Sequence, residues 1–299
     1  MQTNETADVI VIGGSYAGLS AALGLGRSLR KTLVIDNGLP CNRTAPHSHN
    51  FLTQDGVEPS VITAIGKAQV AKYPTVSFVD DTAVSIGGSD NNFLVETSTG
   101  GSFSARKIML ATGILDQLPA IKGFRECWGK SVIHCPFCHG YEYHSRPTGL
   151  LMNGDHAMEM GNMISNWSGD ITIYTNGPCS FTPSQLEILQ QKKIRVNVNR
   201  ISQLVHLDGQ LQEIQFENGD KDSPEVLYHR PLFEQKAPSL ASLGCELDTA
   251  GYIRTDEFQR TTVPGIYAAG DNSSGFRAVS MAVANGSKTA GMLVRELLQ

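Results

Sequence analysis

The chain has 299 residues, of which 40% are hydrophobic and 18% are charged, and its formal net charge is -5. This composition is typical of a globular protein of about two domains and excludes a disordered chain. The negative net charge, without a long basic run, argues against nucleic-acid binding, and no apolar stretch reaches the ~20 residues of a membrane span. The polar N-terminus does not resemble a signal peptide, so we expect a cytoplasmic protein whose six cysteines are mostly reduced.

The chain begins with the pattern of a dinucleotide-binding βαβ unit. Residues 8–12 form an apolar run of strand length, residues 13–18 read Gly-Gly-Ser-Tyr-Ala-Gly, and a second apolar run over residues 32–35 ends in Asp36. Backbone N–H groups at the start of the intervening helix would face a pyrophosphate, and Asp36 would bind a ribose. Gly13 would make the tight turn and Gly18 the close helix packing. Ser15 replaces the second glycine of the usual motif and predicts a slightly looser approach to the phosphate.

The next segment connects this unit to a further buried strand. A turn-rich loop follows Asp36 and carries His47 and His49, whose spacing alone does not decide between a site and solvated side chains. Residues 58–72 have the apolar stripe of a helix, and the short β-like runs between residues 76 and 108 predict a small antiparallel meander. Residues 107–113 then predict a buried strand that ends in small residues, where a flat ligand can approach the backbone.

The middle of the chain carries a Cys-x-x-C motif, Cys135 and Cys138. Two cysteines at this spacing can close a small disulfide ring and exchange readily with other thiols, so we interpret them as a redox pair. A zinc site completed by His134 and His139 and a pair of inert buried cysteines are the alternatives. The remaining cysteines are scattered singly along the sequence, without the second pair that most structural zinc sites need.

A second strand–turn–helix pattern follows over residues 148–159, with its next strand over residues 170–174. Met152 occupies the position of the first glycine, and the strand is followed by Thr-Asn-Gly rather than by the Arg or Lys that a 2′-phosphate needs. The sequence therefore predicts the scaffold of an NADPH-binding domain without its ligand-binding chemistry.

The last part of the chain predicts a short strand that delivers Asp271 after a glycine, and a helix over residues 277–298. The positive end of that helix could stabilise negative charge on a reduced flavin ring. The alternative for Asp271 is an acid that only caps a turn or helix.

Together these motifs resemble the low-molecular-weight thioredoxin reductase family of FAD disulfide oxidoreductases. The resemblance covers essentially the whole chain and rests on residues 13–18, Asp36, residues 111–113, the cysteine pair and residues 264–271. It implies an α/β fold of two Rossmann-like three-layer domains, the second inserted into the first. The FAD-binding domain would comprise residues 1–116 and 241–299, and a pyridine-nucleotide-domain-like insert would comprise residues 117–240. A homodimer is implied as well.

The resemblance also implies roles for single residues. Cys138 would lie against the flavin, Cys135 would exchange with the substrate, and His139 would replace the acid that ordinary thioredoxin reductases have after the second cysteine. Metal ligands are not implied. The residues implied to contact FAD are Gly13, Gly14, Ser15, Ala17, Gly18, Asp36, Asn37, Ala111, Thr112, Gly113, Gly270, Asp271, Arg277, Ala278 and Val279.

The string around the cysteine pair looks more like the branch that contains the dithiol oxidases than like the NADPH-dependent enzymes. We therefore expect an FAD-dependent thiol–disulfide oxidoreductase that works without NADPH on a thioredoxin-like protein or a small dithiol or disulfide. Oxygen would reoxidise the flavin, or a protein donor such as ferredoxin would reduce it. The alternatives are a conventional NADPH-dependent thioredoxin reductase with a divergent nucleotide site, a flavin-bound redox sensor with little turnover, and a zinc-stabilised nucleotide-binding module.

Overall fold

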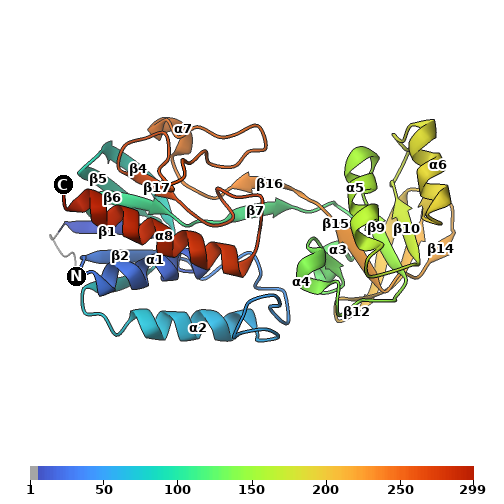
Figure 1. The fold of residues 1–299 in the computed structure, drawn as a ribbon, viewed down its shortest axis with the longest axis horizontal. Helices are drawn as coiled ribbons and strands as arrows, with labels where there is room; N and C mark the ends of the chain where they lie inside the picture. Colours follow the sequence, from blue (N-terminus) through green and yellow to red (C-terminus); the bar gives the residue numbers. More distant parts are fainter. Residues whose placement is uncertain (1–5) are drawn as a thin grey trace. The chain divides into compact units, whose positions relative to one another are not determined.

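The computed structural model describes residues 6–299, so most of the polar N-terminus on which the signal-peptide expectation rests lies outside it. The described chain divides into two compact units (Figure 1). Unit 1 comprises the chain up to Cys41, Phe51–Leu115 and Phe233–Gln299, and unit 2 comprises Asn42–Asn50 and Asp116–Leu232. One unit is thus inserted into the other. The limits of unit 2 differ from those expected for the insert: unit 2 ends at Leu232 rather than at residue 240, and it also includes residues 42–50.

Unit 1 is built from an α/β core and a long C-terminal helix. Its elements are β1 (Ala7–Ile12), α1 (Tyr16–Arg27), β2 (Thr32–Asp36), α2 (Pro59–Val70), β3 (Val76–Asp80), β4 (Ala83–Ser89), β5 (Asn92–Thr97), β6 (Ser102–Leu110), α7 (Leu240–Leu243), β17 (Ile266–Ala268) and α8 (Val279–Leu297). The helix expected over residues 58–72 and the one expected over residues 277–298 are present with slightly shorter bounds.

Within residues 6–299, the sheet of unit 1 has seven strands in the order β3-β2-β1-β6-β5-β4, with β17 also paired to β6. β3, β2, β1, β6 and β17 run parallel, and β4, β5 and β6 form an antiparallel meander. The expectation that residues 76–79 belong to this meander was wrong. They form β3, which follows a helix and therefore returns parallel to β2.

Apolar burial explains why the central strands and helices form. Val9, Ile10 and Val11 in β1 have no exposed surface, as expected for a parallel strand covered on both faces. α1 and α8 lie side by side in unit 1 (Figure 1). A Cβ atom on Gly286 of α8 would collide with the Ala17 carbonyl oxygen of α1, so the small residue permits this close approach.

Unit 2 is a smaller α/β unit with an added antiparallel sheet. Its elements are α3 (Phe124–Cys127), β8 (Val132–Ile133), α4 (Pro136–His139), β9 (Thr148–Leu151), α5 (Gly154–Ile164), β10 (Ile171–Tyr174), α6 (Pro183–Gln191), β11 (Arg195–Asn197), β12 (Ile201–Leu207), β13 (Gln210–Phe216), β14 (Lys221–Asp222) and β15 (Val226–His229).

The described part of unit 2 holds a five-stranded parallel sheet in the order β11-β10-β9-β15-β8 and a three-stranded antiparallel sheet of β12, β13 and β14. The predicted strand–turn–helix–strand over residues 148–174 is β9, α5 and β10. The antiparallel sheet was not predicted. β7 (Ile114–Gln117) pairs with β16 (Leu232–Gln235), and the chain passes between the two units along these strands. No helix within residues 6–299 has both the length and the apolar character to cross a membrane.

Candidate active site

The parallel strands of unit 1 bring the predicted dinucleotide-binding residues to one edge of the sheet. Because β2, β1, β6 and β17 are parallel neighbours, the residues that follow each strand lie together at their carboxyl ends. Three backbone bonds tie this edge: Gly13 N–H donates to the Ile35 carbonyl at 2.8 Å, Ala111 N–H to the Ile12 carbonyl at 2.8 Å, and Ala269 N–H to the Leu110 carbonyl at 3.1 Å. The predicted residues that share the edge are Gly13, Gly14, Ser15, Asp36, Asn37, Ala111, Thr112, Gly113, Gly270 and Asp271.

The glycine turn after β1 requires glycine at two positions. Gly13 has φ +107°, and a Cβ there would collide with the Ala111 carbonyl oxygen. A Cβ on Gly18 would collide with the Gly13 carbonyl oxygen, so α1 could not approach the turn so closely with any other residue. The Gly14 N–H donates to Asp36 Oδ1 at 2.9 Å and fixes the carboxylate at the end of β2.

Ser15 is the N-cap of α1 and has φ -97°, an extended conformation open to any residue, which explains why serine is accepted at the place of the second glycine. The Ser15 side chain makes no capping hydrogen bond to the first turn of α1. The start of α1 lies at the sheet edge, where backbone N–H groups at a helix start favour an anion. Ala17, also predicted to contact the cofactor, is buried in the first turn of α1.

The segment after β17 supplies an acid, a cation and a buried amide to the same unit. Asp271 Oδ2 lies 3.5 Å from Arg277 Nε, and Ala278 is the N-cap of α8, which begins at Val279. Sequence reasoning missed Asn272, which is fully buried and donates through Nδ2 to the Leu110 carbonyl at 2.8 Å. Its Oδ1 has no hydrogen-bond partner among the described residues. A polar residue directly after Asp271 was the available signal.

Cys41 is another residue of this region that the sequence did not single out. Its Sγ donates to the Ile114 carbonyl at 2.8 Å and lies 3.4 Å from where a Cβ on Gly113 would stand. Burial, followed by the nearby Asp271 carboxylate, raises the pKa of the Cys41 thiol, and the Ile114 contact and Arg277 only partly oppose this. The thiol therefore stays protonated at neutral pH and is a poor nucleophile.

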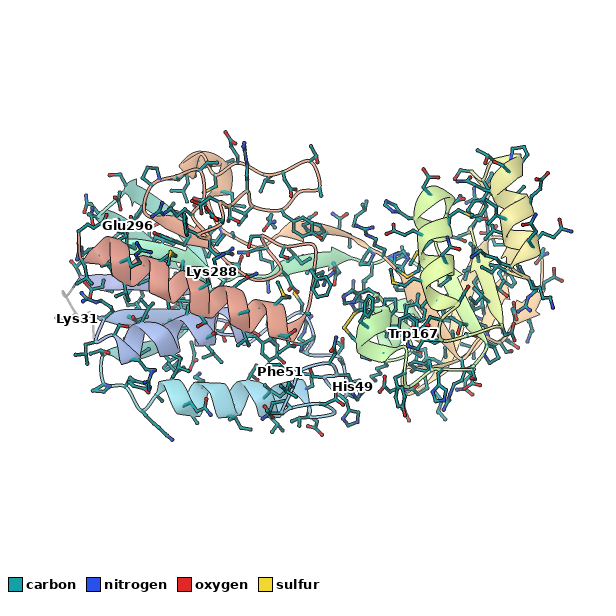
Figure 2. All side chains as sticks on the ribbon, viewed as in Figure 1. Lys31, His49, Phe51, Trp167, Lys288 and Glu296 are labelled. Atoms are coloured by element: carbon teal, nitrogen blue, oxygen red, sulfur yellow. A yellow bond between two sulfur atoms is a disulfide. The ribbon has the colours of Figure 1, made fainter. Side chains whose placement is uncertain are left out.

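In unit 2, Cys135 and Cys138 form a disulfide with their Cα atoms 5.3 Å apart (Figure 2). Cys135 is the N-cap of the four-residue helix α4, and Pro136 is its first residue, where a missing N–H costs no hydrogen bond. Both cysteines are half-buried. Because the two sulfurs are bonded to each other, they offer no thiolate pair to zinc in this state, and no group of three or more metal-binding side chains occurs among residues 6–299.

His139 follows the disulfide and lies among residues from two segments of unit 2. The His49 ring stands edge-on to the His139 ring, with centroids 6.3 Å apart, and His49 Nε2 is 3.5 Å from Glu142 Oε1. Burial lowers the pKa of His139 to about 4, with Glu142 opposing this and His49 adding to it. His139 is therefore a neutral imidazole at neutral pH and can accept a proton.

Aromatic rings pair with each other on residues next to the cysteine pair in sequence. The Phe137 side chain, between the two cysteines, is 54% exposed and packs edge-on against Trp167 at 5.8 Å between centroids. The Trp128 and His134 ring centroids are 6.1 Å apart just before Cys135. An exposed ring beside a half-buried disulfide is suited to contact an apolar part of a thiol substrate.

The corresponding edge of the sheet in unit 2 is closed by its own side chains. Asn153 is the N-cap of α5, and its Oδ1 accepts from Gly154 N, Ser180 N and Ser180 Oγ at 2.9, 2.9 and 3.0 Å. Its Nδ2 donates to the Pro178 carbonyl at 3.0 Å. The helix start is thus occupied by an amide that also holds the loop after β10. Asp155, in the first turn of α5, adds a negative charge where a pyrophosphate would need positive potential.

Comparison with known proteins gives the family. The model of the pyridine nucleotide-disulphide oxidoreductase family matches residues 7–286 of this chain. The chain belongs to this family. Its likeness to thioredoxin reductases within the family extends over nearly the whole chain. A curated protein from Aspergillus oryzae named thioredoxin reductase aclD is 30% identical over 302 residues, which cover 97% of this chain and 96% of that protein.

Solved structures agree with this assignment. An oxidoreductase from Agrobacterium tumefaciens is 36% identical with a TM-score of 0.92, over 98% of this chain and 99% of that chain. A putative thioredoxin reductase TrxB from Bacillus anthracis is 32% identical with a TM-score of 0.93, over 98% of each chain. The protein is a thioredoxin reductase-like FAD-dependent disulfide oxidoreductase, and the expected α/β fold of Rossmann-like domains is confirmed.

Proposed function

We propose that the protein exchanges electrons between FAD bound in unit 1 and a substrate dithiol or disulfide through Cys135 and Cys138, without NADPH. Unit 1 would be the FAD-binding domain and unit 2 the pyridine-nucleotide-domain-like insert. The observation that carries the proposal is the Cys135–Cys138 disulfide of unit 2 in a chain of this family.

The sheet edge of unit 1 fits the parts of FAD. The start of α1, which the Ser15 side chain does not cap, suits the pyrophosphate, and Ser15 Oγ could donate to it. Asp36 can accept from the adenosine ribose. Asp271 would bind the ribityl chain, and Arg277, Ala278 and Val279 at the start of α8 would lie near the pyrimidine ring. The buried, unpartnered Asn272 Oδ1 supports this fit, because a buried acceptor calls for a donor. FAD, when bound, would take up and pass on the two electrons that the cysteine pair gains.

The disulfide would react by two exchange steps. A substrate thiolate attacks Cys135 Sγ, a mixed disulfide forms, and the Cys135–Cys138 bond breaks to release Cys138 as a thiolate. The second substrate thiol attacks the mixed disulfide, closes the substrate disulfide and releases Cys135. The substrate loses two electrons and two protons, and the cysteine pair gains the two electrons. His139, a neutral base beside the pair, would accept the proton of the first attacking thiol.

The proposal that NADPH is not used is supported by the closed edge of unit 2. Asn153 Oδ1 already accepts the Gly154 N–H at the start of α5 and the Ser180 N–H from the loop after β10, and Asp155 places a negative charge in the first turn of α5. A dinucleotide would have to break the Asn153 bonds before its pyrophosphate could bind, and each bond lost without replacement costs on the order of 1 kcal/mol. Oxygen as electron acceptor, or a protein donor such as ferredoxin, would complete the cycle. We further propose a homodimer, from the family resemblance, and a cytoplasmic location, from the four free cysteines.

An anaerobic titration of the flavin-loaded protein tests this proposal. NADPH, NADH, dithiothreitol and reduced thioredoxin are added in separate runs while the visible flavin absorbance is followed, and air is then admitted. Bleaching by dithiols but not by NADPH is expected. Fast recolouring in air would identify a dithiol oxidase, and slow recolouring a reductase fed by a protein donor. Rapid bleaching by NADPH would show that the interpretation of unit 2 is wrong.

The cysteine pair is tested by Cys138→Ser, with Cys179→Ser as the matched control. Cys179 is a free, half-buried thiol elsewhere in unit 2. The Cys138→Ser protein should keep its flavin but no longer be bleached by dithiothreitol, whereas the control should behave as the wild type. Unchanged dithiol oxidation by Cys138→Ser would remove the pair from the mechanism.

A further inference from the structure

We propose that His49 and Glu142 are positioning residues for His139, and that His49 and His139 together hold, beside the Glu142 carboxylate, the proton released when a substrate thiol attacks the disulfide. This inference rests on the proposed function and extends it from the cysteine pair to a loop more than eighty residues away in sequence, counted from His49 to Cys135.

The geometry brings three groups together within unit 2. His139 follows the disulfide on α4, His49 comes from residues 42–50, and Glu142 comes from the turn after α4. His49 touches both of the others: its Nε2 is 3.5 Å from Glu142 Oε1, and its ring meets the His139 ring at an interplanar angle of 83° with centroids 6.3 Å apart. The His47 ring is also near His49, with the two ring centroids 6.3 Å apart.

The loop that carries His49 is held in place by packing. Thr44 fills the space beside Gly129: a Cβ on Gly129 would collide with Thr44 Oγ1. Ser48, directly before His49, is 6% exposed. The side chain of His49 is itself only 20% exposed. A fixed loop can hold an imidazole at one angle to another ring, which a solvated histidine could not do.

The charges decide how many protons the histidines hold. Burial disfavours a charged His139, a protonated His49 disfavours it further, and the Glu142 carboxylate favours it, with the result that the pKa of His139 is lowered to about 4. The charged groups that act on His139 are Glu142 and His49, and the groups near His49 are Glu142, His139 and His47. One carboxylate compensates one positive charge. The histidine pair can therefore take up one proton beside Glu142, and it resists a second.

One proton is what the first exchange step supplies. The substrate thiol gives its proton to the histidine pair as its sulfur bonds to Cys135, and Cys138 leaves as a thiolate. The second substrate thiol gives its proton to the departing Cys135. The reduced protein then carries a Cys135 thiol, a Cys138 thiolate and one imidazolium, so that charge and protons balance. Glu142 favours this state because its carboxylate stabilises the imidazolium, and the imidazolium in turn stabilises the thiolate.

Glu142→Gln tests the proposal in the flavin-loaded protein, with dithiothreitol as the probe. Glu142 is on the surface, 36% exposed, so the neutral amide should leave the fold intact. The inflection in the pH profile for disulfide reduction should move to lower pH by about one unit, which is a tenfold change in proton affinity. The thiolate fraction of the reduced protein at neutral pH, measured from its ultraviolet absorbance before and after alkylation, should fall several-fold.

Two further variants separate charge from packing. Glu142→Asp keeps the charge and should restore part of both effects. His49→Gln removes one of the two imidazoles that hold the proton, so it should lower the thiolate fraction of the reduced protein. His144→Gln is the matched control, because His144 is an exposed histidine that stacks on Tyr141 and contacts its carbonyl oxygen. It should change neither readout.

The outcomes distinguish this inference from the function on which it rests. If Glu142→Gln keeps the wild-type pH inflection and thiolate fraction while Cys138→Ser abolishes dithiol oxidation, the inference is wrong and the proposed function stands. If Cys138→Ser itself still oxidises dithiols, both are wrong. If His49→Gln does not fold, the comparison of Glu142→Gln with Glu142→Asp still decides, because both change a surface side chain.

Discussion

Replacing Lys107 with methionine should destabilise unit 1, because Lys107 is the buried cation of an ion cluster that fastens α8 to the sheet. Its side chain is 3% exposed, and its Nζ lies 2.6 Å from Asp90 Oδ1 and 2.5 Å from Glu296 Oε1. Glu296 is near the C-terminal end of α8 (Figure 2) and also accepts a hydrogen bond from the Tyr267 hydroxyl. Methionine has nearly the length of lysine, so the change removes charge rather than volume.

The expected loss follows from what the substitution leaves behind. Breaking a fully buried ion pair by removing one partner costs about 3–5 kcal/mol. Here the carboxylates that lose their cation, Asp90 and Glu296, are 33% and 22% exposed and regain part of their hydration. We therefore expect the free energy of unfolding to fall by about 2–3 kcal/mol.

The assay is urea unfolding of the flavin-loaded protein, followed by far-ultraviolet circular dichroism and by flavin release. Lys67→Met is the matched control, since Lys67 and Asp80 form a surface pair at 3.1 Å with side chains 49% and 84% exposed. The control should change the free energy of unfolding by less than about 0.5 kcal/mol. A Lys107→Met protein as stable as this control would refute the argument that burial makes the cluster matter.

Three further predictions concern single residues. Gly18→Ala should abolish flavin binding, because its Cβ would collide with the Gly13 carbonyl, whereas Gly169→Ala, with open space around it, should keep the visible flavin absorbance. Asn153→Ala should lower the free energy of unfolding by about 1 kcal/mol in urea without gaining reduction by NADPH, since Asp155 and the missing cations remain. At pH values between its ordinary pKa and about 4, His139 is more protonated in the unfolded protein than in the folded one, so the free energy of unfolding falls as the pH falls. The His139→Asn protein should therefore lose less stability than the wild type between about pH 7 and about pH 5.

Local patterns predicted which residues share the sheet edge of unit 1, because each part of that edge is encoded in a short stretch. An apolar run, a glycine turn and an acid at a strand end each specify their own backbone conformation, and parallel pairing then gathers the strand ends. The same reasoning found the strands and the helix of the second unit at residues 148–174. It misplaced residues 76–79 because a short apolar run does not show whether its strand will pair parallel or antiparallel.

Contacts between distant residues were beyond local patterns. The sequence could not predict that Asn153 occupies the sheet edge of unit 2, because its partner Ser180 is 27 residues away. The association of residues 42–50 with unit 2 depends likewise on Thr44 fitting beside Gly129. The antiparallel sheet of β12–β14 was missed because Gln203 in β12 and Glu213 in β13 stand where the apolar alternation would place a hydrophobic residue.

The strand pair β7–β16 also fixes an order of events during synthesis of the chain. Unit 2 is complete once Leu232 has left the ribosome. Unit 1 still lacks its last 67 residues, Phe233–Gln299, which include β17 and α8. The inserted unit can therefore fold first, while the earlier strands β1, β2 and β6 wait for the strand that carries Gly270 and Asp271 to their edge. A nascent chain stalled just before β17 should thus protect unit 2 from proteases but retain no flavin, so that cofactor capture is a late step of maturation.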